Sequence, residues 1–393
     1  MFRNLTVPGK LVLLGIVFSL PIVVLLYLLI KEQNIAIEFG QQERKGVEYI
    51  KLVRQILHDM QKHQVAFLTG STDASTLEKQ IDQDIRTAQE VDSRYGKEFK
   101  TTHALAGLAE KWSTTRSLVL RSSSSGKPES INSAYDDLVG KTIFPLIIQA
   151  GNTSNLILDQ DLDSYYAMDS VINELPELGQ LIGQAHAHAV DLLLTRENSE
   201  SKKQLISFIL ARIEPALETI NNGLQTSITE NPSLRSKLGA PIRAHIESVQ
   251  AFDDMLRRQV LDAGPSEFSR VDLKSVTAIG LKTLESNYAL YDASANVLDG
   301  LLEARIDKFN SRRSLSFVIV GISALIALFF IASIGRSISR PLAELKEVTD
   351  RINKGDLSTP ADINRHDEIG QLADAINRLQ KTLQSGGKLK TAA

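Results

Sequence analysis

The chain has 393 residues, of which 43% are hydrophobic and 23% are charged. Its net charge of −3 gives no basic excess of the kind that indicates a nucleic-acid partner. It contains no cysteine, which excludes disulfide bonds and is compatible with an oxidising compartment.

Residues 11–30 form an uncharged apolar run that follows a short basic N-terminus, residues 1–10. A helix rises ~1.5 Å per residue, so this run is long enough to cross the ~30 Å core of a bilayer. A cleavable signal peptide has a shorter apolar region and a small-residue cleavage site, whereas here Ile30 is followed directly by Lys31. The sequence therefore predicts a transmembrane helix that is not removed.

Residues 31–314 are predicted to be helical throughout, because apolar residues recur every three or four positions and alternating patterns are nearly absent. Turn and capping residues divide this region into six helices. The predicted helices cover residues 31–69, 73–121, 128–195, 199–229, 232–261 and 267–313.

The lengths of these helices predict how they pack, because short loops make consecutive helices run antiparallel. They fit two four-helix bundles stacked one above the other, with the third and sixth helices shared by both. This all-α arrangement resembles the helical bimodular sensor domains of bacterial chemoreceptors. Pro145, Pro176 and Pro215 fall inside predicted helices, where kinks or breaks would change the helix count.

Residues 158–169 resemble a segment that recurs in the outer domains of bacterial chemoreceptors and related sensor proteins. The segment contains aspartates at alternate positions, as a calcium-binding loop does. Such a loop needs Gly at its sixth position and Glu at its twelfth, where this chain has Ser164 and Ser170. We therefore expect no calcium site, and no other metal or cofactor.

A polar helix face is expected in the same region, because Asn155, Asp159, Asp163 and Tyr166 recur at helical spacing. In the antiparallel scheme this face lies level with polar residues of the first and sixth outer helices. Arg is suited to holding a carboxylate, and a ligand pocket needs a few convergent polar groups. The predicted ligand site comprises Arg54, His58, Asn155, Asp163, Tyr166, Tyr288 and Tyr291. The alternative is a structural network in which Arg54 pairs with Asp163 or Asp159.

Residues 315–334 form a second apolar run that should also span the membrane. Residues 335–393 carry ten basic and eight acidic residues, a net of +2, and residues 1–10 carry a further +2. Because Lys and Arg are retained in the cytoplasm, both ends are predicted to be cytoplasmic. Removing these two contributions from −3 leaves −7, so residues 31–314 are predicted to be an acidic periplasmic domain of a bacterial inner-membrane protein.

Two short heptad helices are predicted after the second span. Pro341 suits the first turn of one helix, and Gly355 suits its end. Asp367 and Glu368 place carboxylates at the N-terminus of the next helix, where the helix dipole favours them. The seam of that helix is Ile369, Leu372, Ile376, Leu379 and Leu383. Two such helices cannot bury their seams in one chain, so the pattern predicts a homodimer that forms a parallel four-helix bundle.

Residues 335–384 resemble the HAMP linker, the parallel coiled-coil relay of chemoreceptors, sensor histidine kinases and membrane cyclases. The resemblance implies that Pro341 and Glu368 couple the span to the bundle, while Leu357 and Ile363 pack the connector onto its core. The relay residues are then Pro341, Leu342, Leu345, Gly355, Leu357, Ile363, Glu368, Gly370, Leu372 and Ile376. The alternative is a dimeric coiled coil without a signalling role. Residues 385–393 are expected to be a flexible tail.

The leading hypothesis is a chemoreceptor-like transmembrane receptor that senses a periplasmic solute or partner protein. The sequence has no Walker loop, no Gly-rich nucleotide box and no Ser/His/Asp signature, so we expect no enzyme and no output domain after the linker. One alternative is an adaptor that dimerises with full-length receptors and lowers their output. The other is the sensor fragment of a histidine kinase. The expected partners are a second copy, membrane lipid and a receptor or downstream signalling protein.

Overall fold

The computed structural model describes residues 6–125, 128–196 and 199–390, and all regular secondary structure in these residues is helical. The all-α class predicted from the sequence is confirmed. The chain divides into two compact parts, one formed by residues 36–308 and the other by residues 1–35 together with 309–393.

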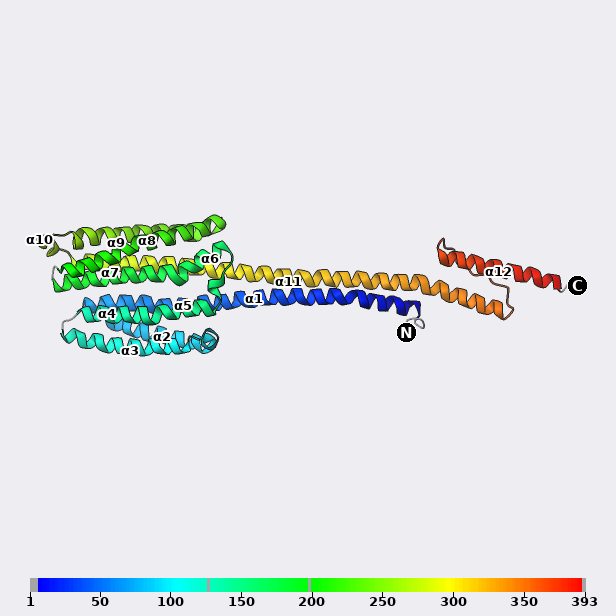
Figure 1. The fold of residues 1–393 in the computed structure, drawn as a ribbon, viewed down its shortest axis with the longest axis horizontal. Helices are drawn as coiled ribbons and strands as arrows, with labels where there is room; N and C mark the ends of the chain where they lie inside the picture. The colour runs from blue at the N-terminus through cyan, green and yellow to red at the C-terminus, as the bar shows by residue number, and fades with distance from the viewer. Residues whose placement is uncertain (1–5, 126–127, 197–198, 391–393) are drawn as a thin grey trace. The chain divides into compact units, whose positions relative to one another are not determined.

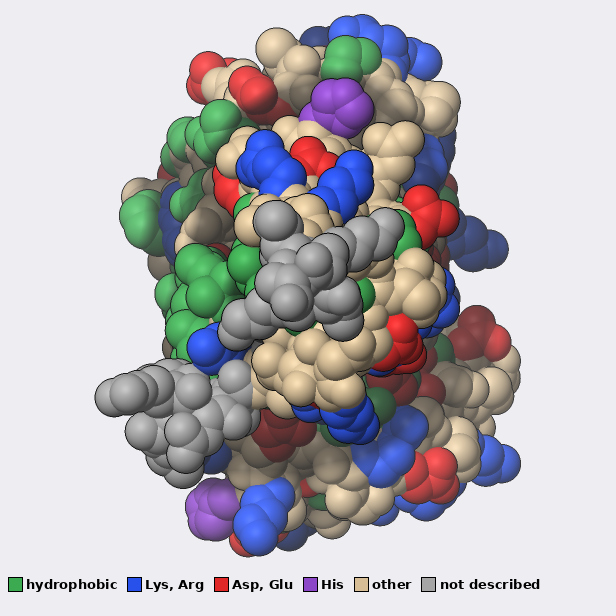
Figure 2. Space-filling view, turned by 90° about the vertical axis from the view of Figure 1, so that its right-hand side faces the viewer, with side chains coloured by type: hydrophobic (Ala, Val, Ile, Leu, Met, Phe, Trp, Pro, Cys, Tyr) green, Lys and Arg blue, Asp and Glu red, His purple; other side chains and the backbone are tan. Residues whose placement is uncertain are grey.

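Two very long helices each contribute to both parts. Helix α1 is Val7–Leu68 and helix α11 is Leu273–Asn353. Both are long and apolar enough to cross a membrane, and their apolar stretches are not buried by other parts of the protein. In the end-on view of Figure 2, hydrophobic side chains gather mainly on the left-hand side, and charged side chains are scattered over the rest of that face. The two predicted spans therefore lie within single uninterrupted helices.

The other helices of residues 36–308 are shorter. In chain order they are α2 (Asp73–Phe99), α3 (Thr102–Ser125), α4 (Pro128–Leu138), α5 (Phe144–Thr153), α6 (Leu162–Asp169), α7 (Leu175–Thr195), α8 (Glu200–Glu230), α9 (Arg235–Leu256) and α10 (Pro265–Phe268). The longer helices of this group each bury an apolar face. In α2, for example, Ile81, Ile85, Ala88 and Val91 repeat every three or four positions and lie in the core.

These helices form two neighbouring sets (Figure 1). In the first set α2 packs against α3 and α5, α3 packs against α4, and Tyr49 of α1 meets the ring of Phe99 edge-on at 6.0 Å. In the second set α8 lies between α7 and α9, and Thr283 of α11 donates a hydrogen bond to Ser248 of α9. Helix α4 contacts α7, so the sets lie side by side, whereas the sequence predicted bundles stacked one above the other.

Two unforeseen chain reversals cause this difference. The predicted helix 73–121 is broken at Lys100, which adopts a left-handed conformation with φ of 56° and ends α2. The predicted helix 128–195 is broken between α5 and α6, where Asn155 has φ of 67° and Asp159 is extended. Asn155, Asp159, Asp163 and Tyr166 therefore do not share the single helix face that the sequence predicted.

Two of the three prolines inside predicted helices, Pro145 and Pro176, follow wider turns, whereas Pro215 lies inside the uninterrupted helix α8. Short π-helical turns η2 (Val139–Ile143) and η4 (Ser170–Glu174) lie immediately before Phe144-Pro145 and Leu175-Pro176. The proline ring collides with the preceding turn of an α-helix, and an extra residue in that turn makes room for the ring. The helix axis continues through each site instead of stopping.

Candidate functional site

Arg54 of α1 lies between two tyrosine rings of α11. Its guanidinium carbon is 5.3 Å from the ring centre of Tyr288 and 4.8 Å from that of Tyr291. The side chain is nearly buried and forms an ion pair with Asp292. Burial lowers the pKa of Arg54, and the neighbouring tyrosines oppose that shift. A cation held against two aromatic faces in this way binds α1 to α11.

His58 extends the same cluster by one helical turn. Its ring centre is 4.2 Å from that of Tyr288, and its Nε2 is 3.2 Å from a carboxylate oxygen of Glu285. Contact with His58, followed by Lys62, lowers the pKa of Glu285 to about 2. The Tyr288 hydroxyl donates to Gln61, whose amide donates in turn to the carbonyl of Gly179 in α7. Four of the seven predicted site residues, Arg54, His58, Tyr288 and Tyr291, are thus brought together.

The other three predicted site residues lie elsewhere. Asn155 donates to Gln42 of α1, which precedes Arg54 by twelve residues, or about 18 Å along a helix. Asp163 accepts from Asn231, and Tyr166 packs on Gly223 of α8. The prediction that all seven side chains meet in one site is wrong, because it depended on an unbroken helix through residues 152–166.

A second buried cluster of charged side chains was not predicted from the sequence. Arg305 of α11 donates to Asp159 and to Ser164, each at 2.6 Å, and lies 3.0 Å from Asp161 and 3.5 Å from Glu43 of α1. The side chains of Glu43 and Asp159 have no exposed surface. Arg305 therefore holds the link between α5 and α6 onto the two long helices.

The sequence did contain a signal for this cluster. Arg305 occupies the same helix face as Leu298 and Leu302, and Glu43 precedes Val47 and Ile50 at helical spacing. A charged residue at a core position requires a buried partner of opposite sign. The partner of Asp159 is Arg305 and that of Arg54 is Asp292, so the predicted structural pairing of Arg54 with Asp159 or Asp163 does not form.

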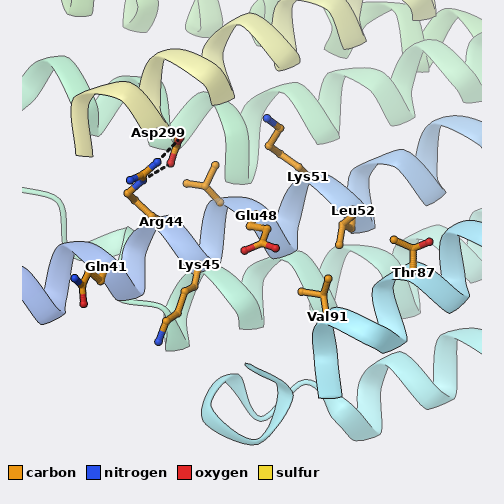
Figure 3. A pocket seen from close by; sticks show the side chains of 10 residues that line it. Gln41, Arg44, Lys45, Glu48, Lys51, Leu52, Thr87, Val91 and Asp299 are labelled. Carbon is orange, nitrogen blue, oxygen red and sulfur yellow. Dashed lines mark hydrogen bonds and ion pairs between the residues drawn. The ribbon is translucent and has the colours of Figure 1, made fainter. Parts of the chain in front are cut away.

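An open groove of about 680 Å³ lies between α1, α2 and α11 (Figure 3). Its lining is strongly charged, but the charges are largely paired. Arg44 forms a two-point contact with Asp299, at 2.7 and 3.0 Å, and Lys45 lies 3.6 Å from Glu98. Among the described residues, no group of three or more His, Cys, Asp or Glu side chains could hold a metal ion.

The C-terminal residues form a small core of their own. Helix α12 (Glu368–Lys390) lies against the end of α11, and Leu345, Val348, Ala361 and Ala373 are buried between them. Gly355 ends α11 with φ of 85°, a conformation that favours glycine. Residues 354–367 form the connector between α11 and α12. The side-chain amide of Asn377 in α12 accepts a hydrogen bond from the N–H of Ala361 in this connector and donates one to its carbonyl.

A model of the HAMP domain family matches residues 333–385. These residues are a HAMP domain. The matched range differs by at most two residues at either end from the range 335–384 that resembles a HAMP linker, and it includes all ten predicted relay residues.

Similarity to known proteins extends over part of the chain. The heme sensor protein HssS of Staphylococcus epidermidis is 35% identical over 77 residues, which are 20% of this chain and 17% of HssS. The sensor protein TorS of Escherichia coli is 25% identical over 240 residues, 53% of this chain and 26% of TorS. The methyl-accepting chemotaxis protein McpA of Bacillus subtilis is 32% identical over 71 residues, 18% of this chain and 11% of McpA.

The chain therefore spans about a quarter or less of the length of these relatives. No solved structure matches it significantly. Together with the two helices that can cross a membrane, the HAMP domain and these relatives identify transmembrane signal transduction as the general role of the chain.

The HAMP geometry differs from the prediction at Pro341, which lies inside α11 and not at the start of a new helix. Proline cannot donate to the carbonyl four residues earlier, which is that of Ser337. Arg365 of the connector supplies the missing donor, with Nη1 2.6 Å from the Ser337 oxygen. Helix α11 continues through Pro341 because a side chain replaces the lost backbone hydrogen bond.

Other relay residues occupy the connector and the start of α12. Ile363 packs against the buried core, and the carbonyl of Leu357 accepts from Gln384. Asp367 accepts from the N–H of Gly370, and this bond, with Arg365 nearby, lowers the pKa of Asp367. A Cβ on Gly370 would collide with the Arg365 carbonyl, so the tight entry into α12 requires glycine here.

Proposed function

We propose that this chain is a chemoreceptor-like transmembrane receptor whose helical body senses a periplasmic solute or partner protein and relays it through the HAMP domain. The observation that carries the proposal is helix α11, which runs without a break from the helical body through an apolar span into the HAMP domain. A change in how α11 packs in residues 36–308 can then reach the HAMP core through one continuous helix.

The proposed topology has residues 11–30 and 315–334 in the inner membrane of a bacterium, with residues 31–314 periplasmic and both ends cytoplasmic. The positive residues beside the spans support this orientation. We further propose that the chain acts as a homodimer, since HAMP helices bury their seams by pairing. Residues 335–384 would be the relay. The flexible tail predicted for residues 385–393 is wrong for residues 385–390, because α12 continues to Lys390, and residues 391–393 lie outside the described residues. The proposal gives the chain no catalytic step.

Arg54, His58, Tyr288 and Tyr291 remain the proposed ligand contacts of the body, although Arg54 already pairs with Asp292. A ligand carboxylate would have to replace Asp292, and this exchange would loosen one contact between α1 and α11. Asn155 contacts α1 at Gln42, and Asp163 and Tyr166 contact Asn231 and Gly223, so none of the three joins that cluster, and we propose a supporting role for them around the start of α6.

The sensor part of a histidine kinase is the second candidate function. The similarity to the sensor protein kinase WalK of Staphylococcus saprophyticus, 33% identical over 90 residues (22% of this chain and 15% of WalK), favours it. The similarity to McpA favours a chemotaxis receptor, and an adaptor that pairs with such receptors would use the same HAMP surfaces.

The relay can be tested in a chimera of residues 1–385 with the catalytic core of a sensor kinase. Solutes that raise the melting temperature of the full chain are first found by a thermal-shift screen of organic acids, amino acids and amines. We expect such a solute to change kinase output in the chimera. Binding without any change in output would contradict the relay.

A disulfide lock provides the matched control. Gly40 of α1 lies against Ile306 of α11, and the chain has no cysteine of its own. Oxidised Gly40→Cys/Ile306→Cys should hold the two helices together and abolish the response of the chimera to the solute. Reduction should restore it. A response that persists in the oxidised variant would show that α11 does not move against α1.

A further inference from the structure

A second groove, of about 420 Å³, separates the two helix sets. One wall comes from α4, η2 and α5, and the other from η4 and α7, with Arg212 of α8 at one end. Pockets of 300–1,000 Å³ are the usual size for small ligands. The groove follows the two π-turns, which are irregular helical sites of a kind often found where proteins bind ligands.

One side of the groove is apolar and partly exposed. Phe144 is half-buried, and the side chain of Ile148 is 39% exposed, although both belong to a helix that otherwise packs into the core. Ile172 and Leu181 face the groove from the opposite wall. Ile172 and Leu181 are already buried, so an apolar ligand group placed here would cover mainly Phe144 and Ile148 and gain the free energy of removing those two from water.

The polar side of the groove is centred on Asp136. Its Oδ1 accepts from the amide of Gln184 at 2.8 Å and from that of Gln180 at 3.3 Å. Its Oδ2 lies 4.0 Å from Nε2 of His188, beyond hydrogen-bond distance. Two amides therefore fix the direction of the carboxylate while leaving one of its oxygens available, and its side chain is 32% exposed.

The charges around the groove leave Asp136 without a cation. The other two charged residues of its lining, Arg212 and Glu177, pair with each other at 2.8 Å. Burial lowers the pKa of His188, opposed by Asp136 and Asp191, and this direction favours the neutral imidazole; the nearby Lys202 pairs with Asp191 and Glu129. Burial also raises the pKa of Asp136, and the hydrogen bond from Gln184 and the nearby His188 oppose this shift only in part.

We propose that this groove binds a small organic ammonium ion, with the ammonium group on Asp136 and the apolar part against Phe144 and Ile148. The ligand supplies the missing cation and covers the exposed apolar wall in one step. The inference depends on the proposed sensing function for its biological purpose, but its test measures binding alone. Because both helix sets form the walls, the bound ligand would hold α4–α5 and α7 together.

The test is isothermal titration calorimetry of the full chain in lipid nanodiscs with phenethylammonium chloride as the probe. The uncharged 2-phenylethanol has nearly the same shape and serves as the control ligand. A charge-assisted hydrogen bond is worth about 1.5–3 kcal/mol, so the alcohol should bind at least ~10-fold more weakly. Absence of saturable ammonium binding, or equal binding of the alcohol, would overturn the proposal.

The matched variants are Asp136→Asn and Asp137→Asn. Asp137 is next in sequence, but it is more exposed and already paired with Lys141. Asp136→Asn should lower the affinity at least ~10-fold, whereas Asp137→Asn should leave it unchanged. Ile148→Trp keeps the carboxylate and fills the groove from its exposed wall, so it should also abolish binding while leaving the melting temperature unaltered. Undiminished binding by Asp136→Asn or Ile148→Trp would reject the site.

The proposed ligand site in this groove and the proposed relay through the HAMP domain can be rejected independently of each other. Phenethylammonium that binds wild-type chain without changing the output of the kinase chimera supports this site and contradicts the relay. A relay that responds to another solute in the absence of phenethylammonium binding rejects this site and leaves the relay intact.

Discussion

Glu43 is a fully buried carboxyl group whose protonation should affect the stability of the protein. Burial, opposed by Arg305 and reinforced by Asp159 and Asp161, raises its pKa from 4.5 to about 8. Between these two pH values the folded protein keeps a proton that the unfolded chain has lost. The contribution of Glu43 to the free energy of unfolding therefore decreases as the pH rises from about 4.5 to about 8.

Glu43→Gln should remove this part of the pH dependence, because an amide of the same shape does not titrate. The melting temperature of the full chain in detergent should fall less between pH 5 and pH 8 in the variant than in wild type, by a few degrees. Glu48→Gln, at a half-exposed position on the same helix, is the control. Identical pH profiles for wild type and Glu43→Gln would mean that Glu43 is ionised in the folded protein.

At the residue scale, the sequence predicts which polar side chains lie inside the helical body better than it predicts the side chains that they contact. Arg54 and the tyrosines meet because each lies on a long regular helix, where spacing alone determines the face. Asp163 and Asn155 could not be placed in this way, because a left-handed residue and an extended residue precede α6. The partner of Asp159 depended on that local backbone, and so Arg305 was missed.

At the scale of elements, the five predicted breaks coincide with helix ends, but the two reversals after α2 and after α5 were not predicted. The turn after α2 falls on Lys100-Thr101, with no Gly or Pro to indicate it. The backbone there is stabilised by tertiary contacts: Thr101 donates to the buried Asp92, which also accepts from Tyr49 of α1. A turn fixed by contacts with another helix cannot be predicted from local sequence.

The HAMP connector offers an element-scale prediction, because Arg365 satisfies the Ser337 carbonyl that Pro341 leaves unpaired. Arg365→Ala should free that carbonyl and loosen the turn of α11 around Pro341. The loss of a charge-assisted bond at a partly exposed site should cost about 1–2 kcal/mol, which corresponds to about tenfold faster amide exchange if opening is local.

Hydrogen-exchange mass spectrometry of the membrane-inserted chain would measure this effect in peptides that cover Ser337 to Pro341 and the connector. Lys354→Ala is the control, because Lys354 is an exposed basic residue of the same connector. If Arg365→Ala exchanges no faster than Lys354→Ala, then water satisfies the carbonyl and Arg365 does not stabilise α11 at Pro341.

At the scale of the whole molecule, one copy of the HAMP domain leaves part of its seam uncovered. Leu345, Val348 and Ala373 are buried within the copy, but the side chains of Leu372, Leu379 and Leu383 are 46%, 55% and 46% exposed. These three leucines repeat at intervals of seven and four, so they form one stripe along α12. A stripe of this kind fits the matching stripe of a second copy.

Leu379→Cys should therefore form disulfide-linked dimers when membranes containing the chain are oxidised, since the protein has no other cysteine. In a parallel pair the two copies of residue 379 face each other across the seam. Asp374→Cys, on the opposite side of α12, should crosslink several-fold less. Adding Leu372→Asp should weaken the Leu379→Cys crosslink, because it would bury a carboxylate in an apolar interface. Crosslinking measured on non-reducing gels that is equal at residues 379 and 374, or unaffected by Leu372→Asp, would exclude a dimer built on this stripe.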